Sequence, residues 1–135
     1  MNLETSLKIA AAGMHAQAAR VRVTAENLAN AQSTGQTPGA DPYRRKTISF
    51  GNVLDRATGA ELVEVRRYGV DSAPFDRRYE PSHPAADAQG YVQYPNVSAL
   101  VELMDMREAQ RSFEANASAR QQASEMLQRT LDLLR

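Results

Sequence analysis

The two histidines are the first residues to consider for chemistry, because imidazole serves both as a metal ligand and as a general base. His15 follows Met14 in a segment with helical periodicity, and His83 lies between two prolines. No His-x-x-x-His pair or His/Asp cluster accompanies them, so the sequence predicts no metal site. The nucleophile elbow, the dinucleotide-binding glycine pattern and the P-loop are also missing. We therefore predict no catalytic residue, no cofactor and no small-molecule substrate.

Basic side chains occur in three pairs that could contact nucleic acid, namely Arg44-Arg45, Arg66-Arg67 and Arg77-Arg78. Adjacent residues of a strand face opposite sides of a sheet, so these pairs would not build one basic face. The 16 basic residues are matched by 16 acidic ones, which gives a net charge of zero. This balance predicts neither nucleic acid nor an anionic membrane surface as a partner. The absence of cysteine excludes disulfides, and no apolar run is long enough to predict a membrane span.

Residues 97–135 carry the longest helical pattern of the chain. This segment contains neither Gly nor Pro, and its apolar residues recur at steps of three or four. At about 1.5 Å per residue, such a helix would be roughly 58 Å long. It must pack on another long helix, either in its own chain or in a neighbour. Asn96 or Ser98 is placed to cap its first turn.

Residues 3–30 carry the second helical pattern. Its apolar residues follow a heptad stripe in which alanine often stands where a strong coiled coil has leucine. Alanine favours the helix and lets neighbouring helices approach closely. Two interpretations stay open at this point. The segment is either an amphipathic helix in a globular core or a helix that packs in a multi-helix assembly.

The middle of the chain, residues 43–95, is typical of short strands between turns. We predict strands at 43–50, 62–68, 75–79 and 91–94, where β-branched and aromatic residues are frequent. Turn signals separate them at Gly51-Asn52, Thr58-Gly59, Asp71-Ser72 and Pro81-Ser82. Three or four such strands make one small sheet of limited stability, which would depend on the helices or on a neighbouring molecule.

The predicted fold is mainly α with a small β insert. Long N- and C-terminal helices form a coiled-coil-like pair, and the middle segment is β-rich. We assign residues 1–31 and 96–135 to a terminal helical domain and residues 32–95 to a loop and a small β-rich insert. Subunits of this kind that associate head to tail without closing a ring give a helical tube or filament. The residues thus favour a structural assembly protein, with a cytoplasmic coiled-coil adaptor or chaperone-type protein as the alternative.

The sequence also resembles a known family. NLANAQSTG at residues 27–35 is similar to the signature that ends the N-terminal helix of bacterial flagellar rod, hook and related axial proteins. PYRRKTISF at 42–50, the stretch 79–97, EAQRSFEAN at 108–116 and the leucine-rich end at 126–134 are similar to one rod member of this family. The resemblance covers nearly the whole chain, with agreement in order, spacing and length.

The resemblance implies a structural component of the proximal rod of the flagellar basal body, located in the periplasm. It implies export by the flagellar type III apparatus without a cleaved signal peptide. Without the resemblance, the lack of a signal peptide would suggest a cytoplasmic protein. The implied partners are copies of the chain, other rod proteins, the basal-body adaptor protein and the export apparatus. The terminal helices would form the inner layer of a tube that transmits torque.

The apolar stripes of the two helices supply the residues that we expect at the assembly interface. They are Leu3, Leu7, Met14, Val21, Leu28, Met106, Phe113, Leu127, Leu131 and Leu134. We expect Asn27 and Asn30 to fix the end of the first helix. Burial of the stripes against neighbouring subunits would supply stability that the alanine-rich helix lacks by itself.

Overall fold

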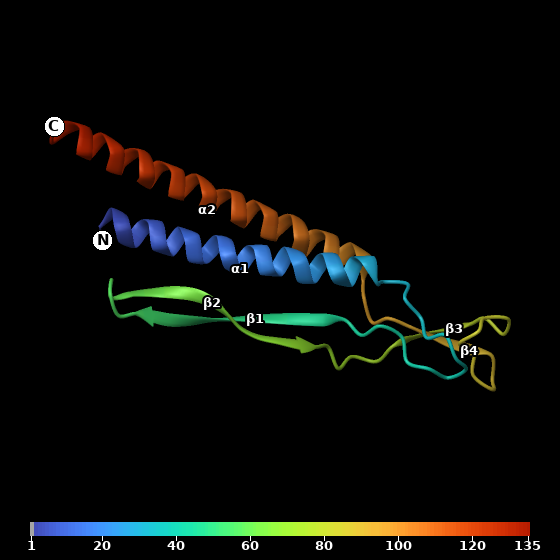
Figure 1. The fold of residues 1–135 in the computed structure, drawn as a ribbon. Coiled ribbons are helices and arrows are strands. Elements are labelled where there is room, and N and C mark those ends of the chain that lie inside the picture. The colour runs from blue at the N-terminus through green and yellow to red at the C-terminus, as the bar shows by residue number, and fades with distance from the viewer. Residues whose placement is uncertain (1) are drawn as a thin grey trace. The chain divides into compact units, whose positions relative to one another are not determined.

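A computed structural model describes residues 2–135 and contains two long helices with four strands between them in the sequence. The elements are α1 (Leu3–Ala29), β1 (Lys46–Asp55), β2 (Ala60–Val70), β3 (Asp76–Tyr79), β4 (Tyr91–Tyr94) and α2 (Ala99–Leu133), coloured in chain order in Figure 1. The predicted fold class, two terminal helices with a β-rich middle, is confirmed. Both helices lie within two residues of the predicted bounds.

The described chain divides into two compact units. One unit comprises the chain up to Val21, Ile48–Arg67 and Arg107–Arg135, and the other comprises Arg22–Thr47 and Tyr68–Met106. α1, α2, β1 and β2 are divided between these units, while β3 and β4 belong wholly to the second. We call them the helix-pair unit and the β3–β4 unit and describe each by itself.

The helix-pair unit has a core of small side chains. Its buried hydrophobic residues in the described chain are all alanines, namely Ala10, Ala16, Ala109 and Ala123. Gly13 of α1 faces Asn116 of α2 so closely that a Cβ on the glycine would lie 2.7 Å from the Asn116 side-chain oxygen. Small residues therefore let the two helices approach, but they bury little apolar surface. Since burial contributes about 25 cal/mol per Å² of apolar surface, this unit gains little stability from its own core.

The β1–β2 hairpin belongs mainly to the helix-pair unit. Its turn follows Asp55, whose side chain accepts hydrogen bonds from the Thr58 hydroxyl and the Ala57 N–H, and Gly59 has a φ of 70°. The predicted turn at Thr58-Gly59 is thus confirmed. Lys8 of α1 lies 3.2 Å from the Asp55 carboxylate and ties the helix to the end of β1.

Two predictions for the middle segment are wrong. Gly51-Asn52 is not a turn, since both residues lie inside β1. A Cβ on Gly51 would meet the Arg66 Nε at 3.2 Å, so this glycine makes room for a neighbouring side chain within a strand. The strands also form two separate two-stranded sheets and not one sheet.

The β3–β4 sheet has a small core of its own, which explains why it does not need the other strands. β3 pairs antiparallel with β4, from Asp76 opposite Tyr94 to Tyr79 opposite Tyr91. One face of the pair buries Val92 and Tyr94 against Ala85. The Tyr94 hydroxyl donates to the Glu80 carboxylate, with both oxygens at 3.0 Å, so the buried ring keeps a polar partner.

Candidate assembly surface

The first part of the candidate assembly surface is an open groove between α1 and α2 in the helix-pair unit. One stretch of about 440 Å³ is lined by Ala18, Val21, Gln110, Phe113 and Glu114. Two further stretches, of about 510 and 320 Å³, share Met14 between them, and the smaller also contains Ala18 and Phe113. Three of the predicted interface residues, Met14, Val21 and Phe113, thus come together along one groove with an apolar floor and charged edges.

The second part is the C-terminal end of α2. The helices are antiparallel, because Gly13 faces Asn116 and Arg20 pairs with Glu108 at 3.4 Å. If this register continues, the first residue of α1, Leu3, lies opposite residue 126 of α2. Residues 127–135 then extend beyond α1, and we call them the overhang.

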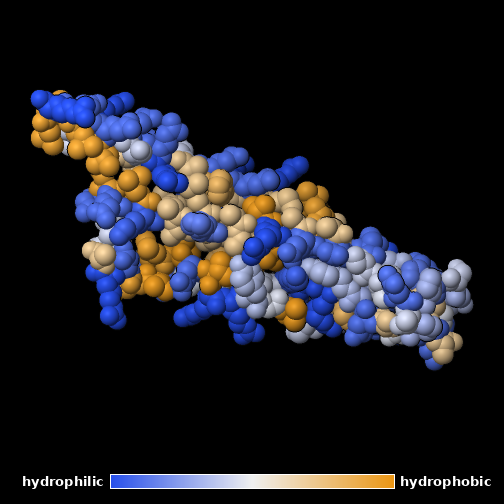
Figure 2. Space-filling view, viewed as in Figure 1, coloured by the Kyte–Doolittle hydropathy of each residue, from blue (hydrophilic) through white to orange (hydrophobic). Residues whose placement is uncertain are grey.

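The overhang exposes the three leucines that the sequence analysis assigned to the interface. Leu127 is 39% exposed, Leu131 55% and Leu134 80%, so exposure rises with distance from the end of α1. Figure 2 shows hydrophobic atoms in orange at this end of α2, at the upper left. Leucines spaced four and three residues apart on one helix face form an apolar stripe that the described part of the chain does not cover.

The remaining predicted apolar residues lie half-buried in the described chain. They are Leu3, Leu7, Leu28 and Met106. Asn30 acts near the end of α1, where its amide donates to the Glu26 carbonyl at 2.8 Å and its oxygen accepts from the Ser33 hydroxyl. The assignment of all these residues to an interface between subunits stays a prediction.

Asn27 makes contacts well beyond the end of its own helix. Its side chain is completely buried and joins three segments of the β3–β4 unit. The side-chain oxygen accepts hydrogen bonds from the Lys46 N–H and the Tyr43 hydroxyl, each at 2.8 Å. The amide nitrogen donates to the Lys46 carbonyl at 2.9 Å and to the Glu102 carboxylate at 3.2 Å. Asn27 therefore connects α1, the start of β1 and α2.

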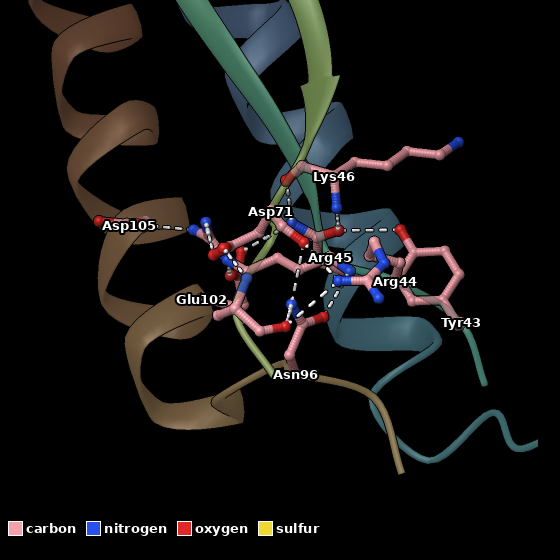
Figure 3. A network of polar contacts seen from close by, with 10 residues as sticks. Tyr43, Arg44, Arg45, Lys46, Asp71, Asn96, Glu102 and Asp105 are labelled. Carbon is pink, nitrogen blue, oxygen red and sulfur yellow. Dashed lines mark hydrogen bonds and ion pairs between the residues drawn. The ribbon is translucent and has the colours of Figure 1, made fainter. Parts of the chain in front are cut away.

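Glu102 and Arg45 form the charged centre of the same network, which we call the polar cluster (Figure 3). The Glu102 side chain is fully buried in the first turns of α2, and the Arg45 Nε donates to it. Arg45 also approaches Asp71 at 3.6 Å and Asp105 at 3.9 Å. Although burial opposes it, the nearby Glu102 carboxylate raises the pKa of the Arg45 guanidinium. A buried carboxylate is tolerated here because a cation and an amide satisfy it.

Asn96 belongs to the polar cluster and is not the cap of α2. Its side-chain oxygen accepts from the Arg45 N–H at 2.9 Å, and its amide donates to the Asp71 and Ala73 carbonyls. Ser98, the other predicted cap, immediately precedes α2, and its carbonyl accepts from the Glu102 N–H at 3.0 Å. Asn96 is therefore held by tertiary contacts that local sequence rules do not reveal.

Tyr43 lies at the edge of the polar cluster and Tyr94 lies in the core of the β3–β4 sheet. Burial raises the pKa of the Tyr43 phenol. Burial also raises the pKa of Tyr94, and its hydrogen bond to Glu80 adds to the effect. Both groups are thus held in the protonated form in the folded chain.

Because of these two tyrosines, we expect the folded chain to lose stability at alkaline pH. Because their pKa values are higher in the folded chain than the ordinary value near 10, their contribution is complete below that pH and falls as pH rises through the folded values. Denaturant unfolding followed by circular dichroism between neutral and strongly alkaline pH measures this loss. Tyr94→Phe should flatten the alkaline decline, whereas Phe in place of the exposed Tyr68 should not. An equal decline in all three proteins would contradict the assignment.

No sequence pattern predicted that Arg45, Asp71, Asn96 and Glu102 come together in one cluster. Arg45 and Glu102 are far apart in the chain, and no local pattern pairs them. One signal was present, since Glu102 interrupts an apolar run (ALVELM) at the start of a helix. A charged residue that is flanked by apolar residues on both sides either exposes the apolar residues or buries its own charge.

Within residues 2–135, no three His, Asp or Glu side chains are grouped so that they could hold a metal ion. No helix among the same residues is long and apolar enough to cross a membrane.

Comparison with known proteins points to the flagellum. The profile of the family described as "Flagellar basal body rod FlgEFG protein C-terminal" matches residues 88–133, which include the whole of α2. The chain is also similar to a protein of Agrobacterium fabrum named flagellar basal-body rod protein FlgC. The two are 50% identical over 133 residues, which cover 98% of this chain and 96% of the relative.

More distant relatives carry the same name. The protein from Escherichia coli O157:H7 is 39% identical over 136 residues, and the alignment covers 98% of each chain. The protein from Bacillus subtilis is 35% identical over 143 residues, and the alignment covers 95% of each chain. The similarity therefore extends through the helices and the β-rich middle.

Proposed function

The chain belongs to the FlgC family of flagellar basal-body rod proteins, and from this premise we propose how it works as a structural component of the rod. Its terminal helices pack on those of neighbouring subunits and build a helical tube that transmits torque. The observation that carries this proposal is the overhang, whose Leu127, Leu131 and Leu134 form an apolar stripe beyond the end of α1. The role is structural, and the proposal assigns no catalytic step.

The groove and the alanine core support the same mechanism. A helix pair that buries mainly alanine gains little from its own packing, so contacts with neighbours supply much of its stability. The groove beside Met14, Val21 and Phe113 offers an apolar floor for another helix. In this arrangement residues 1–31 and 96–135 act as the axial domain, and residues 32–95 lie outside it.

The location is the flagellar basal body, and the finer assignments are part of the proposal. The chain occupies the proximal rod in the periplasm and reaches it through the flagellar type III export apparatus without a cleaved signal peptide. Its partners are copies of itself, other rod proteins, the basal-body adaptor protein and that apparatus. The thin core supports this route, because a marginally stable chain unfolds at little cost. The relatives give no support to the alternative of a cytoplasmic coiled-coil adaptor.

Leu131→Asp tests the proposal in cells that lack the natural copy of the protein. We expect loss of swimming and of assembled rods, because the substitution places a charge in the centre of the apolar stripe of the overhang. The isolated chain should keep its stability, since Leu131 is 55% exposed in it. Swimming assays and electron microscopy of purified basal bodies measure the two effects.

Gln122→Asp is the matched control, because it adds the same charge to α2 on the side opposite the leucines. This variant should swim and assemble rods. Normal rods in the Leu131→Asp strain would contradict packing through the overhang.

A further inference from the structure

The first turns of α2 lie in the β3–β4 unit. There a charged side chain is buried and apolar side chains are exposed, which is the reverse of the usual distribution. The carboxylate side chain of Glu102 is fully buried, while four large apolar neighbours are exposed. Leu100 is 70% exposed, Met104 63%, Val101 49% and Leu103 41%. We call these four residues the apolar turn. A contiguous exposed apolar surface of this kind marks an interaction site.

The polar cluster explains why the apolar turn faces outward. Arg45 and Asn27 both bind the Glu102 carboxylate, so they fix the rotation of the helix about its axis. At 100° per residue, Leu100 and Met104 then point away from the side that Glu102 occupies. The contacts of the buried Glu102 carboxylate therefore keep the apolar side chains exposed. This exposure indicates that the apolar face has a partner.

We propose that the apolar turn of one copy receives the overhang of α2 from a second copy. This inference rests on the proposed function and specifies one contact within it. Along α2 and the residues that follow it, the other main group of exposed large apolar residues is Met126, just before the overhang, with Leu127, Leu131, Leu133 and Leu134 within it. Their spacing suits a helix ridge that packs across Leu100 and Met104.

The area of the apolar turn argues against a closed dimer that pairs it with itself. Four partly exposed side chains offer a few hundred Å², whereas a stable interface uses about 800 Å² from each partner, so one such contact per copy is too small and each copy needs a second. A closed dimer would bury this small surface and leave the overhang exposed. A head-to-tail contact buries both surfaces on every internal copy, and because the two surfaces differ, the same contact repeats from one copy to the next.

Cysteine cross-linking tests the contact directly, since the natural chain has no cysteine that could form a competing disulfide. Full-length Met104→Cys and Leu131→Cys proteins, tagged to differ in mass, are mixed at high concentration and oxidised. We expect the mixed cross-link about tenfold in excess over a control, the ratio that ~1.4 kcal/mol of contact free energy gives. The control replaces Met104→Cys by Arg111→Cys, an exposed position on the same helix. A chain that carries both Met104→Cys and Leu131→Cys should give a ladder of oligomers.

Three outcomes would overturn the inference. A dominant cross-link between two Met104→Cys chains would indicate a closed contact between apolar turns, and a dominant one between two Leu131→Cys chains would pair the overhangs. Yields equal to the Arg111→Cys control would mean that the contact does not form. Circular dichroism of each variant confirms folding before oxidation. In all three cases the Leu131→Asp strain still reports separately on the proposed function.

Discussion

Arg45→Met should destabilise the folded chain by about 3–5 kcal/mol, the usual loss when one partner of a buried ion pair is removed. The remaining partner, Glu102, is fully buried in the polar cluster. Without the guanidinium, the Glu102 carboxylate keeps the Asn27 amide as a donor but loses its countercharge. A single domain has about 5–15 kcal/mol of stability in total, so this loss removes a large share of it. Urea unfolding followed by circular dichroism gives the difference in free energy.

A double variant distinguishes the loss of charge compensation from the loss of packing. Replacing both partners, Arg45→Met with Glu102→Leu, should restore most of the stability, because no charge then remains buried. Lys46→Met is the matched control. Its ion pair with Glu26 at 2.8 Å is half-exposed on both sides, so its loss should be much smaller than that of Arg45→Met. If the double variant were as unstable as Arg45→Met, packing and not charge would explain the effect.

The double variant also bears on assembly. The polar cluster fixes the rotation of α2, and the apolar turn faces outward as a result. A stable variant with Leu at position 102 would have an apolar residue on each side of the helix and no charge to select one of them. We expect such a chain to remain folded and to give fewer cross-links at the Met104→Cys position, since buried polar contacts can fix register.

The helices could be predicted from the sequence because their signal is local. A period of three to four residues over more than 25 positions leaves little choice, and both α1 and α2 agree with it. The overhang could also be predicted in part. Leu127, Leu131 and Leu134 continue the apolar stripe of the second helix, which is longer than α1 and cannot be covered by it over its whole length. The β insert was harder, because Gly51 signals a turn locally and only the Arg66 side chain on the paired strand shows why a glycine lies in β1.

The polar cluster could not be predicted, because its contacts join residues that are far apart in the chain. Arg44 and Arg45 are adjacent basic residues in the sequence, yet their side chains make different contacts. Arg44 stacks over the Phe75 ring at 4.1 Å, and Arg45 binds the buried Glu102. Asn27 and Asn30 were both expected to act at the end of α1. Asn30 bonds there, whereas the Asn27 side chain binds Tyr43, Lys46 and Glu102. Sequence rules describe what a side chain can bind locally, and tertiary contacts decide what it does bind.

Asn27→Ala should cost about 2–4 kcal/mol, because it removes four hydrogen bonds at once, and the one to Glu102 is fully buried. The Lys46 N–H, the Lys46 carbonyl and the Tyr43 hydroxyl all lose a hydrogen bond to a side chain that is completely buried. Each buried polar group left unsatisfied costs about 1–3 kcal/mol, although relaxation and water entry reduce the sum. Denaturant unfolding of the isolated protein measures the loss. Asn30→Ala is the control and should cost less, since that residue is half-buried and serves one helix end.

Asn27→Asp tests the hydrogen bonds of Asn27 without a change in packing, because Asp has nearly the same size and shape as Asn. Its carboxylate can still accept from the Lys46 N–H and the Tyr43 hydroxyl, but it can no longer donate to the Lys46 carbonyl or to Glu102. It also places a second negative charge where the amide nitrogen lay 3.2 Å from the Glu102 carboxylate. We therefore expect Asn27→Asp to be at least as unstable as Asn27→Ala at neutral pH, and to recover stability as the pH falls and the carboxyl is protonated. Equal stability of Asn27→Asp and the natural protein at neutral pH would show that donation by Asn27 does not hold α1, β1 and α2 together.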